Sequence, residues 1–250
     1  MNKNYVEKFC TLAIDTVSNN PTASLSKLEN NNVQIKSINL LKPSNTSSQI
    51  QRYDSSLFPT RIFELCSLLN VKPHQIKDLL YCSGPGPFSS IRVGVVISRI
   101  LKRINPDLQV YKFNLLYLLY RHLKKEGFID KEKFHINKNN LIILYMKAGI
   151  KDFFKEAYDL NTNRILEKAH LVNNISSNFC NLKENHFLKE KIDPNNSQGF
   201  LINPKADNLD FNLSNLMIEL RKKENVDIFQ ASLNEIKPQY IKEASVTLKA

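Results

Sequence analysis

The sequence has 250 residues, of which 42% are hydrophobic and 24% are charged, as is ordinary for a globular protein. This length allows one large domain or two smaller ones, each with its own core. No stretch reaches the roughly 20 apolar residues of a membrane span, and the N-terminus is too polar for a secretory signal. The net charge of +11 suits a polyanionic partner. Dispersed lysines would serve solubility equally well, and no basic-aromatic motif is visible.

The four cysteines are Cys10, Cys66, Cys82 and Cys180, and none belongs to a CxxC pair. Their spacing suggests neither a zinc site nor a disulfide framework. We interpret them as buried thiols of a reducing compartment, which predicts a cytoplasmic protein.

The first half of the chain predicts a strand meander followed by alternating helices and strands. Apolar runs and alternation separated by turn residues predict strands over 8–15, 22–28 and 33–38. A polar loop covers 41–56. The elements that follow are a helix near 58–70, a strand at 79–82, a helix near 89–104, a strand near 109–112 and a helix near 113–125.

The second half is less clearly patterned. We expect strands at 140–146, 149–158 and 164–169 and a helix over 209–221, whereas 173–196 shows no clear pattern. Three meandering strands followed by alternating elements are typical of a ribonuclease H-like or actin-like half-domain. We therefore predict an α/β protein with mixed sheets flanked by helices, an N-terminal domain over 1–125 and a smaller one over 126–250, without an internal repeat.

The helix near 89–104 is apolar on two sides. One side carries Ile91 and Val95 with Gly94 between them. The other is a longer face made of Val93, Val96, Ile97, Ile100, Leu101 and Ile104. One side can pack on the sheet, and the other needs a neighbouring helix or another chain.

The segment Gly84–Gly94 (GPGPFSSIRVG) joins the strand at 79–82 to this helix. No Lys-Ser/Thr pair follows the glycines, so the segment is not a phosphate-binding P-loop, and it is not a GxGxxG motif. Two interpretations remain open. The glycines and prolines form a sharp strand-to-helix turn, or the turn brings backbone amides against a ligand.

No catalytic residue or metal ligand is predicted. Asp15 ends the first strand, but a two-metal nuclease needs converging carboxylates, and the corresponding position after the strand at 79–82 is Ser83. No two of the five histidines are spaced i,i+4 on a credible helix. They are His74, His122, His135, His170 and His186.

Four segments in chain order resemble the TsaB family (YeaZ-like, within the Gcp or M22-peptidase-like group). They are Leu12–Thr16 (LAIDT), Tyr53–Pro59 (YDSSLFP), Gly84–Gly94 and Pro238–Lys242 (PQYIK). The sequence departs from the family pattern at Tyr53, Pro87 and Ser90, and a second-domain motif is only faintly matched, at Tyr145–Phe153.

The resemblance implies an actin-like ATPase fold in a non-catalytic dimerisation subunit. Such a subunit pairs with and activates a TsaD-like transferase, which makes threonylcarbamoyladenosine at position 37 of tRNAs, and a TsaE-like ATPase binds the pair. The chain itself would need no cofactor, although ATP or ADP is possible at the complex junction. tRNA would be contacted through the complex, and a homodimer is plausible when the partner is absent.

The resemblance also assigns residues to two sites. A vestigial nucleotide cleft would involve Asp15, Thr16, Gly84, Gly86 and Ser89. The pairing surface would use Pro59, Ile62, Phe63, Cys66, Ile91, Arg92 and Val95. On that assignment, Ile91→Asp or Val95→Asp would abolish pairing and leave the fold mostly intact.

Two other functions are compatible with the same superfamily. An ATP-dependent phosphotransferase or ATPase would need a second phosphate loop and a metal carboxylate, and neither is found in the sequence. A metallopeptidase would need zinc ligands, which are also not found.

Overall fold

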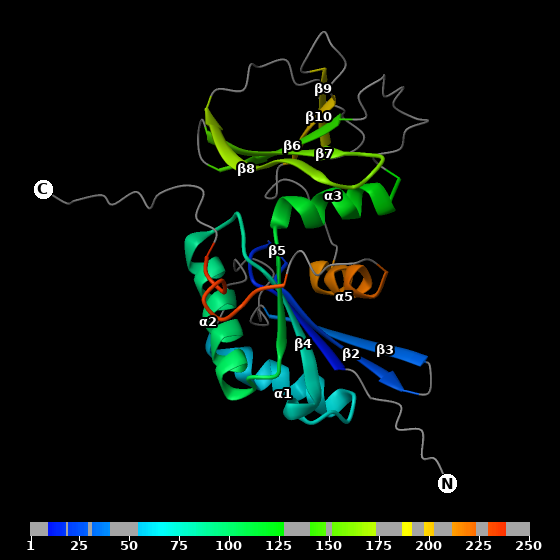
Figure 1. Cartoon of the computed structure of the whole chain (residues 1–250), viewed down its shortest axis with the longest axis vertical. Helices are drawn as coiled ribbons and strands as arrows, with labels where there is room; N and C mark the ends of the chain where they lie inside the picture. Colours follow the sequence, from blue (N-terminus) through cyan, green and yellow to red (C-terminus); the bar gives the residue numbers. More distant parts are fainter. Residues whose placement is uncertain are drawn as a thin grey trace, which may run out of the picture. The chain divides into compact units, whose positions relative to one another are not determined.

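The computed structural model describes residues 10–18, 20–29, 32–40, 55–127, 141–148, 152–173, 187–191, 198–202, 212–223 and 230–238. The chain forms two compact units, which Figure 1 colours by sequence. The first comprises Met1–Asn114 and Asp210–Pro238, and the second comprises Leu115–Leu209 and Gln239–Ala250. These units differ from the predicted domains, 1–125 and 126–250. The helix that begins at Leu115 belongs to the second unit, and Asp210–Pro238 belongs to the first.

The first unit is built on a mixed sheet of five strands in the order β3-β2-β1-β4-β5. The meander β1–β2–β3 is antiparallel, whereas β4 and β5 add to β1 in parallel. The carboxyl ends of β1, β4 and β5 therefore share one edge of the sheet. The strands are β1 (Cys10–Asp15), β2 (Thr22–Glu29), β3 (Asn32–Asn39), β4 (Ile76–Cys82) and β5 (Gln109–Phe113).

Two helices cover one face of this sheet. They are α1 (Phe58–Leu68), preceded by the short helix η1 (Ser55–Leu57), and α2 (Phe88–Ile104). A second short helix, η2 (Pro73–Gln75), leads into β4. The crossovers from β1 to β4 and from β4 to β5 advance in the same direction, and right-handed crossovers then place α1 and α2 on the same face.

The opposite face of the first sheet receives helix α5 (Leu213–Lys223) through a polar layer. On β2, the Thr22 and Ser24 hydroxyls hydrogen-bond the Ser214 hydroxyl. The Asn212 side chain accepts the Asn215 backbone N–H at 2.9 Å, as an N-cap does. Alternation along β2 directs Lys27 to the other face, where its Nζ donates to the Leu69 carbonyl just beyond α1 at 3.3 Å. Figure 1 shows α5 on the other side of the sheet from α1 and α2.

The second unit has helix α3 and a sheet in the order β8-β7-β6-β10-β9. The meander β6–β7–β8 and the parallel strand β10 beside β6 repeat the arrangement of β1–β2–β3 and β4. Strand β9 is antiparallel to β10, unlike β5 beside β4. The elements are α3 (Leu115–Lys125), β6 (Leu141–Lys147), β7 (Asp152–Asp159), β8 (Ile165–Asn173), β9 (Phe187–Lys191) and β10 (Gln198–Ile202).

Contacts with the β7–β8 hairpin tie α3 to the second unit. The rings of Tyr120 and Tyr158 stack with centroids 4.3 Å apart. Lys124 Nζ donates to the Leu160 carbonyl at 2.9 Å and to the Asn163 side-chain oxygen at 2.6 Å. The Tyr120 hydroxyl also donates to Asn163, at 3.0 Å. These long-range contacts decide where a helix that follows β5 directly in sequence belongs.

The predicted fold class, an α/β protein with mixed sheets flanked by helices, is confirmed. Each predicted strand and helix corresponds to one in the structure, with ends that shift by a few residues. Strands β9 and β10 were not predicted, because the surrounding segment is rich in Asn and Lys and hides their apolar residues. Within the described part of the chain, no helix combines the length and apolar character needed to cross a membrane.

Candidate functional site

Two turns meet at the carboxyl edge of the first sheet. Strand β1 ends at Asp15 and β4 ends at Cys82, and the parallel register that pairs Ile14 with Tyr81 brings these ends together. The turn after β1 contains Thr16, and the turn after β4 contains Gly84 and Gly86. The structure therefore brings four of the five predicted cleft residues to one place. The fifth, Ser89, lies exposed in the first turn of α2.

Asp15 is fully buried and holds the turn that follows it. Its Oδ1 accepts the backbone N–H groups of Val17 at 2.9 Å and Ser18 at 3.1 Å, and its Oδ2 accepts the Ser18 hydroxyl. Burial raises the pKa of the carboxyl above its ordinary value, and these hydrogen bonds offset part of that rise. Both oxygens are thus used within the turn, which gives Asp15 a structural role.

We expect Asp15→Asn to stabilise the protein relative to wild type increasingly as pH rises from about 4 to 7. A raised folded-state pKa means that stability is fully present below the unfolded pKa and is lost as pH rises through the folded pKa. Asparagine keeps the Oδ1 acceptor and carries no buried charge. Urea unfolding of both proteins across this pH range measures the effect.

Asp15→Ala is the matched control. It removes the acceptor as well as the charge, so it should be about 1–3 kcal/mol less stable than Asp15→Asn at every pH. A pH-independent difference between Asp15→Asn and wild type would contradict the proposed cost of the buried carboxylate.

The glycines allow the two turns and α2 to pack closely. Gly84 has φ 109°, a backbone conformation that favours glycine. A Cβ on Gly86 would lie 2.3 Å from Val17 Cγ1, and a Cβ on Gly94 would lie 2.8 Å from Thr16 Oγ1. The Thr16 hydroxyl donates to the Ser90 carbonyl at 2.7 Å. This geometry accounts for the glycines as a tight strand-to-helix turn, while ligand contact by the same turn stays a prediction.

The predicted pairing residues divide into exposed and buried ones. Pro59, Phe63 and Arg92 are exposed, and the Arg92 guanidinium lies over the Phe88 ring at 4.2 Å from its centroid. Four others are buried in the first unit: Ile62, Cys66, Ile91 and Val95. A partner cannot reach these four side chains on the folded unit. The assignment of Ile91 and Val95 to the outer side of α2 is therefore corrected.

The outer side of α2 is the longer apolar face. Val96, Ile100 and Ile104 are 52%, 51% and 75% exposed, whereas Ile91 and Val95 are 2% and 4% exposed. We call these three residues the outer stripe. Gly94 and Ser98 share the buried side with Ile91 and Val95. Their small size was the sequence signal for that side, because small residues let a helix approach a sheet closely.

Three arginines flank the outer stripe. Arg92, Arg99 and Arg103 are exposed and recur seven and four residues apart, so they form a row along one side of the helix. On α1, Phe63 is 61% exposed and Leu68 is 55% exposed. The helical face of the first unit thus combines accessible apolar side chains with a positive row.

The other polar groups of interest among the described residues are candidate metal ligands and thiols. Among them, no group of three or more His, Cys, Asp or Glu side chains could hold a metal ion. Cys10, Cys66 and Cys82 are buried thiols that are not in disulfides, as predicted, and Cys180 lies outside the described residues. Burial first, and the Asp15 charge second, raise the pKa of the Cys82 thiol. Burial also raises that of Cys66.

The meander, the parallel additions and the helices on both faces define an actin-like (ribonuclease H-like) α/β fold. YeaZ from Pseudomonas aeruginosa shares it with a TM-score of 0.58 and 12% identity, over 92% of this chain and 99% of that chain. A second structure, described as an uncharacterized protein with similarity to peptidase YeaZ from Pseudomonas aeruginosa, matches with a TM-score of 0.56 and 12% identity. The match covers 93% of this chain and 99% of that one. No protein-family model and no curated sequence matches this chain.

Proposed function

We propose that this chain is a TsaB-like, non-catalytic subunit that pairs with and activates a TsaD-like threonylcarbamoyltransferase acting on adenosine 37 of tRNAs. The observation that carries the proposal is the exposed outer stripe of α2, on the same face of the sheet as the exposed Phe63 of α1, in a YeaZ-like fold. Large apolar side chains gathered on one helical face of a folded unit are typical of a protein-protein contact. The match to YeaZ over nearly the full length of both chains supports the same role.

The pairing surface that we propose consists of Phe63, Val96, Ile100 and Ile104, with the arginine row at its rim. The apolar side chains would lose their exposed area on docking, which supplies most of the affinity. The arginines predict acidic residues on the facing surface of the transferase, where they would speed association and select the partner.

The remaining parts of the proposal rest on the resemblance to the TsaB family. A TsaE-like ATPase would bind the assembled pair, and ATP or ADP could lie at the junction of the complex near the 15–18 and 83–87 turns. The tRNA would be contacted by the complex, and the protein would act in the cytoplasm.

Replacing Ile100 with aspartate should abolish pairing with the TsaD-like protein of the same organism. A charge at the centre of the apolar surface must be desolvated on docking, so we expect the affinity to fall about 100-fold or more. Titration calorimetry of the two purified proteins measures the loss. Threonylcarbamoyladenosine in total tRNA from a deletion strain complemented with the variant reports the consequence.

Leu166→Asp is the matched control, because Leu166 is 58% exposed on β8 in the second unit and receives the same substitution. It should bind like wild type. The proposed function would be overturned if the wild-type protein did not bind the TsaD-like protein and tRNA modification were normal in the deletion strain. Normal binding of the TsaD-like protein by Ile100→Asp would contradict the proposed pairing surface.

A further inference from the structure

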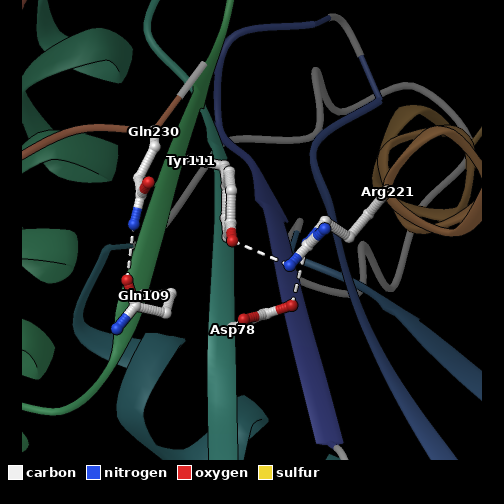
Figure 2. Close-up of polar contacts among 5 residues, drawn as sticks. All are labelled: Asp78, Gln109, Tyr111, Arg221 and Gln230. Atoms are coloured by element: carbon white, nitrogen blue, oxygen red, sulfur yellow. Dashed lines mark hydrogen bonds and ion pairs between the residues drawn. The ribbon is translucent and has the colours of Figure 1, made fainter. Parts of the chain in front are cut away.

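The C-terminal part of the first unit lies along the outer edge of β5. Gln230 forms an antiparallel bridge with Tyr111, and the Ala231 N–H donates to the Val110 carbonyl at 2.8 Å. The Gln230 side-chain amide donates to the Gln109 side-chain oxygen at 2.6 Å, as Figure 2 shows. We call Gln230–Pro238 the edge segment.

Two apolar anchors and a compact turn fix the edge segment. Ala231 and Ile236 are buried, whereas Gln230, Ser232, Asn234 and Glu235 are exposed. The Ile236 N–H donates to the Ser232 carbonyl at 3.1 Å, and the Glu235 carboxylate accepts the Ser232 N–H at 2.8 Å. The segment therefore carries its own turn between one strand-like contact and one buried aliphatic side chain.

Arg221 of α5 holds the strand that the edge segment covers. Its Nε donates to Asp78 Oδ2 at 2.9 Å, and its Nη2 donates to the Tyr111 hydroxyl at 2.8 Å (Figure 2). The guanidinium also lies 4.4 Å from the centroid of the Tyr111 ring. Tyr111 is thereby fixed from the α5 side, and the position of β5 does not depend on the edge segment alone.

Strand β5 ends the sheet, so its outer backbone groups would otherwise face solvent. Alternate residues of a strand direct their N–H and C=O to the same side. The Val110 carbonyl faces the edge segment and the Phe113 carbonyl faces Ser83, so Val110 and Lys112 direct theirs outward. An uncovered edge of this kind accepts an added strand.

We propose that the outer edge of β5 is a strand-addition surface. The chain's own edge segment covers it, and the same segment of a second copy takes that place when the first is displaced. We identify the second copy's segment as the occupant because the same segment already fits this edge within one chain. Gln230 bonds Gln109, Ala231 bonds Val110, and Ile236 is buried. A segment exchanged between identical chains makes the same contacts in trans. This surface is separate from the outer stripe of α2 and does not depend on the proposed function.

The test uses the full chain with Ala231→Asp, in which a buried charge displaces the edge segment. The probe is a fluorescein-labelled peptide of residues 230–238 (QASLNEIKP), which stands for the segment of a second copy. Fluorescence anisotropy should show at least about tenfold tighter binding to the Ala231→Asp chain than to wild type. In wild type the tethered segment competes at a high effective concentration.

Two controls locate the binding. Adding Lys112→Pro to the Ala231→Asp chain should abolish it, because the proline ring stands where an outward N–H was and blocks a strand from lying along this edge, without touching the β4 side. A peptide with Ile236→Asp should not bind. A full chain with Asn234→Asp, which adds a charge at an exposed position of the same segment, should bind the probe as weakly as the wild-type chain does.

Equal binding by Ala231→Asp and wild type would overturn the proposal, as would tight binding that survives Lys112→Pro. Far-UV circular dichroism checks that the variants are folded. If Ala231→Asp does not fold, a double variant with Gln230→Ala and Ala231→Gly loosens the segment without burying a charge. Probe binding equal to wild type, or tight binding that survives Lys112→Pro, would then overturn the proposal in the same way.

Discussion

Replacing Ile91 with aspartate should unfold the first unit, whereas the same replacement at Ile100 of the same helix should leave it folded. Both residues lie on α2, but Ile91 is 2% exposed and Ile100 is 51% exposed. A carboxylate at Ile91 would be buried beside the sheet without a partner, which costs more than about 4 kcal/mol. At Ile100 the charge faces solvent, and the change should stay within about 0.5 kcal/mol.

Urea unfolding followed by far-UV circular dichroism measures both effects. Ile91→Val provides the conservative control and should cost about 1 kcal/mol, the usual value for one lost buried methyl group. Equal stability of Ile91→Asp and Ile100→Asp would show that the two sides of α2 have been assigned wrongly. The comparison also prepares the pairing experiment, because loss of binding by Ile100→Asp is informative only if that variant is folded.

Replacing Gly86 with alanine should destabilise the protein by about 1–3 kcal/mol, because the new Cβ overlaps Val17. The two atoms would be 2.3 Å apart, so one turn must move away from the other. Val17 cannot rotate away easily, since a β-branched side chain has restricted χ1 and this one is buried. Thermal and urea unfolding of the variant measure the loss.

A double-mutant cycle tests the cause. Val17→Ala removes Cγ1, so Gly86→Ala should cost about 1–2 kcal/mol less in that background than in wild type. Gly94→Ala is the matched control, because its Cβ would meet Thr16 and not Val17. Val17→Ala should not relieve it. Additive effects of Gly86→Ala and Val17→Ala would contradict the close packing of the two turns.

The candidate site was partly readable from sequence. The resemblance to the TsaB family placed Asp15 and the GPGP segment in one cleft, and the structure brings both to the same edge of the sheet. The role of the Asp15 carboxylate was not readable, since it depends on Val17 and Ser18 folding back onto the same side chain. Which glycine approaches which residue also depends on atoms far apart in sequence.

Local periodicity and turn residues were enough to predict the order of the helices and strands, apart from β9 and β10. The sequence also showed that α2 is apolar on two sides. The tertiary structure shows which side faces outward, because Gly94 and Ser98 let the Ile91 side approach the sheet while the outer stripe remains exposed. It likewise placed α3 with the second unit and α5 with the first. Contacts such as Lys124 with Asn163 and Arg221 with Asp78 join residues far apart in sequence, and no local pattern encodes them.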